Sequence, residues 1–200
     1  MIVKTLPVGP VETNCYLIAD PNTLDAAVID PGGDAPRILK AIDALKLHVR
    51  YVLNTHGHFD HIMANAAVVD AIGAELCIHP GDAELLADGG GAAFFGMEAS
   101  SPAPTHLLAD GETLLIGGIR LQVLFTPGHT PGGCSFYSRA GGVLFSGDCL
   151  FQMGIGRSDL PGGDPYVLAR SLKERLMALP DPTVVYPGHG PSTTIGHERI

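Results

Sequence analysis

The stretch NTHGHFDHIMAN, residues 54–65, places four polar side chains within six positions, directly after an apolar run. The four are His56, His58, Asp60 and His61. If the chain stays extended past Thr55, His56 and His58 point to the same side, because side chains alternate along a strand. Asp60 and His61 then face a second point, where the chain turns into a helix. The spacing therefore predicts two metal ions rather than one.

The same pattern recurs in weaker form at three later junctions. VLFTPGHT, VLFSGDCL and VVYPGHG each end an apolar strand in a turn, and they place there His129, Asp148 and His189. Several ionisable groups are costly to bury together without a cation. We therefore expect a metal site at the carboxyl edge of a sheet. The other histidines lack such partners and are expected to be surface or capping residues: His48, His79, His106 and His197.

Composition sets the class of protein. The chain has 200 residues, 46% hydrophobic and 16% charged, which fits one domain over residues 1–200 with a sizeable core. Its net charge of −9 argues against nucleic-acid binding, because no basic stripe can displace counterions. No apolar run is long enough for a bilayer, and no leader is evident. The four cysteines form no C-x-x-C pair and indicate reduced thiols, so we expect a cytoplasmic protein.

Alternating strands and helices predict a layered α/β fold. Strands are expected at residues 2–8, 15–20, 26–30, 49–54, 75–79, 134–138, 142–148 and 183–190, with a hairpin over 110–126. Helices are expected after Asp34, over 62–73 and 81–87, and after Asp164. Residues 81–110 include three successive glycines, and we expect either a mobile flap or a loop with a short helix there.

The ordered set THGHFDH, TPGHTPG, SGDCLF and YPGHG resembles the metal-binding motifs of the metallo-β-lactamase superfamily. The resemblance covers nearly the whole chain. It implies an αβ/βα four-layer sandwich with the metals at one edge of the sheets. It also implies two groups of ligands: His56, His58 and His129 for the first metal, and Asp60, His61 and His189 for the second, with Asp148 bridging them. By the same resemblance, Asp30 would steady the metal loop; the alternative is an ordinary turn residue at a strand end.

Within the superfamily the chain looks most like the short bacterial form of the glyoxalase II group. GIGRSDLPGGD lies where that group carries a G-x-G followed by a base, so Arg157 would meet an anionic part of the substrate; the alternative is a surface ion pair. Larger members add a helical domain that supplies much of the glutathione contact. The expected reaction is hydrolysis of S-lactoylglutathione, or another small S-(2-hydroxyacyl) thioester, to the hydroxy acid and thiol.

Two ions sharing a water lower its pKa to about 7 or below, which gives a bridging hydroxide for the attack. Asp60 would bind one metal and help orient the water. Zinc is the expected metal, although iron or manganese also accepts these ligands. Cys149 adjoins Asp148 but should point the other way, as a packed thiol.

Three alternatives stay open. A persulfide dioxygenase would use one iron on His56, His129 and Asp148, and it carries a related G-x-G-R-[ST]-D segment. A lactonase or other ester hydrolase would use the same centre. A metal-binding module without catalysis would need a closed site, whereas seven ligands shared between two ions leave room for water and substrate.

Overall fold

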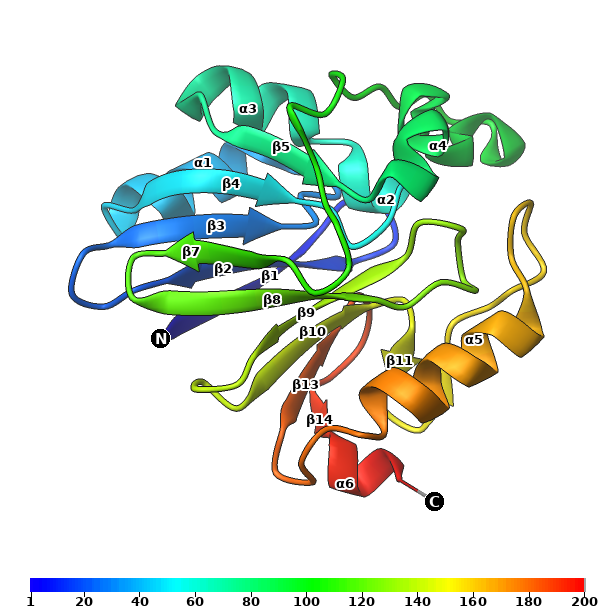
Figure 1. Ribbon diagram of the computed structural model, residues 1–200. Helices are drawn as coiled ribbons and strands as arrows, with labels where there is room; N and C mark the ends of the chain where they lie inside the picture. Colours follow the sequence, from blue (N-terminus) through cyan, green and yellow to red (C-terminus); the bar gives the residue numbers. More distant parts are fainter. Residues whose placement is uncertain (200) are drawn as a thin grey trace.

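Two six-stranded sheets form the core of the computed structural model, which describes residues 1–199 (Figure 1). The first sheet follows chain order: β1 (Ile2–Val8), β2 (Thr13–Ala19), β3 (Asp25–Ile29), β4 (His48–Leu53), β5 (Glu75–Ile78) and β6 (His106–Leu107). β1, β2 and β3 pair antiparallel, whereas β3 to β6 run parallel. The carboxyl ends of these parallel strands therefore meet at one edge.

The second sheet has the order β14-β13-β10-β9-β8-β7. Its strands are β7 (Thr113–Ile116), β8 (Ile119–Phe125), β9 (Cys134–Ser138), β10 (Val143–Gly147), β13 (Val184–Pro187) and β14 (Thr193–Thr194). β10 and β13 run parallel, and β7 to β10 pair antiparallel. A small hairpin of β11 (Leu150–Phe151) and β12 (Gly154–Ile155) follows β10.

Helices cover the outer faces of both sheets, which gives the expected αβ/βα sandwich (Figure 1). α1 (Ala35–Ala44) and α3 (Asn65–Ile72) pack on the first sheet. α5 (Pro165–Ser171), which continues as the π-helical turn Leu172–Leu176, packs on the second, and α6 (Ile195–Glu198) lies near the C-terminus. Between the sheets, apolar side chains such as Ile18, Ile29, Phe136 and Phe145 are fully buried. Their burial supplies the main force that holds the layers together.

Short helical segments lie at the edge where the parallel strands end. They are α2 (Phe59–Ile62), the 3-10 helices η1 (Pro80–Asp82) and η2 (Gly89–Phe95), and α4 (Ala83–Ala87). Residues 81–110, which we expected to be a flap or a loop with a short helix, thus contain α4, η2 and β6. Among residues 1–199, no helix has both the length and the apolar character that a membrane crossing requires.

One detail of the expected secondary structure is wrong, and one helix begins as expected but without the usual capping bond. The helix expected over 62–73 begins only at Asn65, because Ile62 ends the separate short helix α2; Gly73 closes it as expected, in a left-handed conformation. Asp34 occupies the N-cap position of α1, with a φ of 49°, but its side chain makes no capping hydrogen bond and instead accepts from the Gly9 amide. Asp164, in contrast, caps α5 through the amides of Tyr166 and Val167.

Candidate metal centre

Four loops, each following a strand, converge where the two sheets meet. β4 ends at Leu53, within one residue of the expected end, so the motif at residues 56–61 follows the strand and lies in a loop and in α2. The loops after β8, β10 and β13 carry His129, Asp148 and His189. The Thr55 carbonyl accepts a hydrogen bond from the Cys134 amide (2.7 Å), which ties the two sheets together beside the motif.

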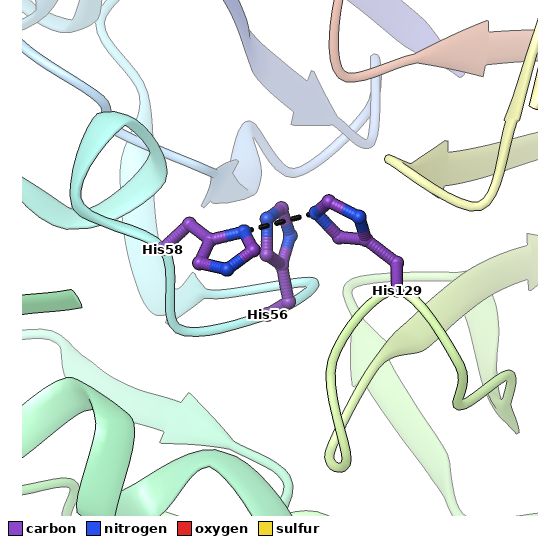
Figure 2. A group of neighbouring side chains, drawn as sticks. All are labelled: His56, His58 and His129. Atoms are coloured by element: carbon purple, nitrogen blue, oxygen red, sulfur yellow. Dashed lines mark hydrogen bonds between the residues drawn. The ribbon is translucent and has the colours of Figure 1, made fainter. Parts of the chain in front are cut away.

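Three imidazoles form the first group of potential ligands (Figure 2). Nδ1 of His58 lies 2.9 Å from Nε2 of His129. The ring of His56 stands nearly perpendicular to both, with ring centroids 4.8 Å and 4.7 Å away. His56 and His129 are buried, and His58 is partly buried.

A second group lies beside the first and consists of Asp60, His61 and His189. Oδ2 of Asp60 is 3.1 Å from Nε2 of His189 and 3.5 Å from Nε2 of His61. Asp148 stands between the groups: its Oδ2 is 3.7 Å from Nε2 of His129 and 3.6 Å from Nε2 of His189, while its Oδ1 is 3.4 Å from Nε2 of His61. The structure thus brings together all seven residues that the sequence proposed as ligands.

Hydrogen bonds at the outer ring nitrogens leave the inner nitrogens free to accept a cation. Nδ1 of His61 donates to Asp30 (2.9 Å), and Nδ1 of His129 donates to the carbonyl of Arg157 (2.7 Å). Nδ1 of His56 donates to the hydroxyl of Thr55 (3.0 Å), since that hydroxyl itself donates to Asp30. An imidazole held in this way presents the lone pair of its other nitrogen, as a metal ligand must.

Three buried polar atoms in this cluster have no hydrogen-bond partner within residues 1–199: Nε2 of His56, Nε2 of His61 and Oδ1 of Asp148. Buried polar groups nearly always have a hydrogen-bond partner, so three such atoms without one in the same cluster need an explanation. Imidazole nitrogens and a carboxylate oxygen are a donor set that zinc, iron and manganese accept. The residues present therefore fit divalent metal ions.

Burial and neighbouring charges shift the pKa values of four of these histidines, two downward and two upward. Burial, together with the neighbouring imidazoles, lowers the pKa of His58 to about 4 and holds that of His56 well below its usual value. Burial opposes protonation of His61 and His189 as well, but the carboxylates of Asp60 and Asp148 outweigh it and raise both pKa values. His56 and His58 are thus neutral at neutral pH, the form in which imidazole binds metals.

Asp30 lies next to this cluster and holds two of its segments by hydrogen bonds. It is buried at the end of β3, and its carboxylate accepts from the amide (2.8 Å) and hydroxyl (2.7 Å) of Thr55 as well as from His61. It therefore holds the start of the metal loop and one ring of the second group at once. Its φ of 50° lies in the left-handed region, a conformation that an aspartate tolerates better than most residues.

Strand β2 supplies contacts that the sequence did not reveal. Thr13 donates its hydroxyl to Oδ2 of Asp60 (3.1 Å). The side chains of Asn14 and Tyr16 donate to the carbonyl of Pro187, at 3.1 Å and 2.6 Å, and so hold the loop of His189 against the first sheet. In the sequence these residues look like ordinary strand positions, because their hydrogen-bond partners come close only when the two sheets pack together.

Glycine lets the His189 loop approach the centre. A Cβ at Gly188 would lie 2.1 Å from Oδ1 of Asp148 and 2.8 Å from Cε1 of His61, closer than real Cβ contacts come. Only glycine fits at this point of the Pro-Gly-His turn, because the backbone passes directly over the side chains of Asp148 and His61.

Arg157 lies beside the centre but is already paired. Its Nε and Nη2 donate to the two carboxylate oxygens of Asp159, both at 2.8 Å, and its side chain is 55% exposed. Its carbonyl accepts the hydrogen bond from His129, a contact that no pattern in the sequence indicates. The loop that carries this base is therefore attached to a ligand of the first group.

Residues that we expected to stay outside the centre do so. The thiol of Cys149 is buried, and burial raises its pKa to about 12, as expected for a packed side chain. His106 pairs with Glu112 (2.7 Å), and His79 accepts from the Gly81 amide (3.1 Å) in a capping role. His48 and His197 are exposed.

Comparison with known proteins agrees with this geometry. A family model described as "Metallo-beta-lactamase superfamily" matches residues 8–189. The chain is 37% identical over 204 residues to a protein of Haemophilus influenzae named hydroxyacylglutathione hydrolase GloC, and the match covers 100% of this chain and 95% of that one.

Three solved structures resemble the whole chain. BLEG-1, described as a B3 metallo-beta-lactamase, is 39% identical with a TM-score of 0.94, covering 98% of this chain and 96% of that one. TTHA1623 in a di-iron-bound form is 40% identical with a TM-score of 0.89, covering 99% and 96%. ETHE1 from Myxococcus xanthus is 32% identical with a TM-score of 0.85, covering 100% and 82%.

Proposed function

The chain belongs to the metallo-β-lactamase superfamily, and on that premise we propose that it is a metal-dependent hydrolase of the glyoxalase II type. The substrate would be a small acyl-thioester, most simply S-lactoylglutathione. The observation that carries the proposal is the pair of ligand groups with Asp148 between them. The 37% identity to a hydroxyacylglutathione hydrolase supports the choice of reaction.

In this proposal the seven side chains hold two divalent ions. His56, His58 and His129 would hold one ion, Asp60, His61 and His189 would hold the other, and Asp148 would contact both. When bound, such a pair of ions supplies a water of lowered pKa and a Lewis acid for the thioester carbonyl. Zinc suits the donor set, and the relative found in a di-iron-bound form makes iron a second choice.

The chain's own residues would orient the reactants. Thr13 donates to Oδ2 of Asp60 and so restrains this carboxylate, which would then keep one orientation toward an attacking water. Arg157 would meet an anionic part of the substrate through Nη1, which Asp159 does not use. No protein acid is needed for the departing thiolate, because a thiolate is a good leaving group. The thiol of Cys149 takes no part, since it is buried and neutral.

A second candidate is a persulfide dioxygenase with one iron. It is favoured by the likeness to ETHE1 and by the place of Asp148, whose Oδ2 lies 3.7 Å from His129. A two-histidine, one-carboxylate face of His56, His129 and Asp148 would suit a non-haem iron. Against it stands the complete second group, which a single iron would leave unused.

Oxygen consumption separates the two candidates. The purified protein, reconstituted in turn with zinc, iron and manganese, is given S-lactoylglutathione and then glutathione persulfide in an oxygen electrode. We expect loss of the thioester without oxygen uptake. Uptake with the persulfide, with the thioester left intact, would replace the hydrolase by the dioxygenase. A lactone and a chromogenic cephalosporin are tested as further substrates. The cephalosporin is included because of the likeness to BLEG-1.

A further inference from the structure

Asp82 is a fully buried carboxylate that belongs to neither ligand group. It ends the 3-10 helix η1 and stands at the N-cap of α4, yet its side chain makes no capping hydrogen bond. An aspartate at such a position normally serves the helix. Here both of its oxygens are used elsewhere, and the partners lie in two ligand loops.

The three hydrogen bonds of Asp82 join the loops of two different sheets. Oδ2 accepts from the amide of Gly57 (2.9 Å), the residue between His56 and His58. The same oxygen accepts from the hydroxyl of Thr130 (2.7 Å), which directly follows His129. Oδ1 accepts from the amide of Gly132 (2.6 Å), farther along the same loop.

The backbones around this carboxylate are packed too closely for other side chains. A Cβ at Gly132 would lie 2.3 Å from the amide nitrogen of Asp82, and one at Gly81 would lie 2.9 Å from the Cα of Gly132. The turn of η1 and the loop after β8 are therefore in backbone contact. Asp82 is thus held in one place, and its oxygens fix the Gly57 and Thr130 segments relative to each other.

The two loops that Asp82 joins are those that bring Nδ1 of His58 to 2.9 Å from Nε2 of His129. We propose that Asp82 is a positioning residue that sets the spacing of the three-histidine group by anchoring one loop from each sheet. It touches no imidazole and acts only through the amide of Gly57 and the residues after His129. The inference rests on the proposed function, because it assumes that these histidines hold a metal ion.

An amide cannot replace this carboxylate. Thr130 can reverse its hydroxyl, but the amides of Gly57 and Gly132 can only donate. In Asp82→Asn the new NH2 group must face one of these two amides, whichever way the side chain turns. One buried backbone N–H then loses its acceptor, and the spacing of the histidines loosens. Residues that hydrogen-bond a metal ligand directly contribute roughly 10- to 100-fold to metal affinity; Asp82 acts one residue farther from the ion, so we expect an effect at the lower end of that range.

The test is a zinc titration against a chromophoric chelator. His58→Ala and His189→Ala first show which binding step belongs to which ligand group. Asp82→Asn should then weaken the step that His58→Ala removes by roughly 10-fold, the lower end of the range for partners of metal ligands, with less effect on the other step. The visible spectrum of the cobalt-substituted protein should change as well, because it reports ligand geometry directly.

Asp20→Asn is the matched control. Asp20 is also buried and also accepts from two backbone amides, those of Asn22 and Gly118, but it lies beyond the far end of β2. This variant should lose comparable thermal stability and keep both zinc affinities. If Asp82→Asn fails to fold, Thr130→Val takes its place, because it removes one donor to the carboxylate while keeping the shape of the side chain.

The outcomes separate this inference from the proposed function. If the wild-type protein binds no metal ion, the proposed function is wrong. If the wild type binds zinc and Asp82→Asn binds it equally tightly with an unchanged cobalt spectrum, the positioning role is wrong. Equal loss of affinity in Asp20→Asn would also overturn it, because the effect would then come from general destabilisation.

Discussion

Nδ1 of His58 lies 2.9 Å from Nε2 of His129, although the two residues are 71 positions apart and follow strands of different sheets. Two ring nitrogens at this distance share at most one proton, and a cation bound by both would take its place. This pair brings a loop from each sheet into the same three-histidine group (Figure 2).

Replacing His58 should remove the ion of the first group. In His58→Ala we expect thioester hydrolysis to fall at least 100-fold and the zinc content to drop by about one ion per chain, since a three-ligand group loses one ligand. The zinc content is measured by metal analysis after dialysis. His106→Ala, which affects a histidine paired with Glu112 away from the centre, should keep both values. Equal losses in the two variants would contradict the assignment.

Removing the hydroxyl of Thr13 should lower turnover more than metal content. The hydrogen bond from Thr13 to Asp60 is made to a charged group, and such bonds contribute about 1.5–3 kcal/mol. Thr13→Val should therefore lower kcat by roughly 10- to 100-fold, while Thr13→Ser, which keeps the hydroxyl, stays near wild type. Steady-state kinetics and zinc analysis of both variants provide the check. If the serine variant falls as far as the valine variant, the hydrogen bond is not the cause.

Arg157→Ala should raise KM and leave the metal in place. The substitution removes the guanidinium but keeps the backbone carbonyl that accepts from His129, so the first ligand group retains its support. We expect a KM increase of roughly 10-fold for an anionic thioester. Arg170→Ala, on the exposed face of α5, serves as the control for loss of a positive charge. A fall in zinc content without a change in KM would show that Arg157 acts on the metal loop instead.

The buried thiols should resist modification until the protein unfolds. Burial raises the pKa of Cys77 and of Cys149 to about 12, and it raises those of Cys15 and Cys134 as well. Since thiolate is the reactive form, a disulfide reagent at mildly alkaline pH should label none of the four in the native state and all four in urea. Because the folded-state pKa is raised, the thiols' contribution to stability is present below about pH 8.5 and declines as pH rises above it. Rapid labelling of one native thiol would contradict the packing.

The sequence predicted those parts of the structure that depend on local pattern. Apolar strands that end in histidine or aspartate gave the positions of the seven clustered side chains, and Asp164 with Pro165 gave the start of α5. The break between α2 and α3 was missed, because Ile62 and Asn65 lie in a continuous helix-like pattern. That break arises from tertiary contacts: the amide of Ala64 donates to the carbonyl of Pro31.

The supporting residues could not be predicted, because their partners come from distant strands. Nothing in the sequence near Asp82 indicates that it accepts hydrogen bonds from Gly57 and Thr130, which lie 25 and 48 positions away. The same holds for Tyr16, whose hydroxyl reaches the carbonyl of Pro187 across 171 positions. Such contacts exist only once the two sheets are packed face to face.

The measurement that tests the central claim most directly is hydrolysis of S-lactoylglutathione by the metal-reconstituted protein, followed as loss of the thioester absorbance. We predict rapid turnover that a chelator abolishes and that added zinc or iron restores, with Asp148→Asn inactive under the same conditions. Turnover that survives full removal of metal, or no turnover by protein that carries two bound ions, would contradict the account.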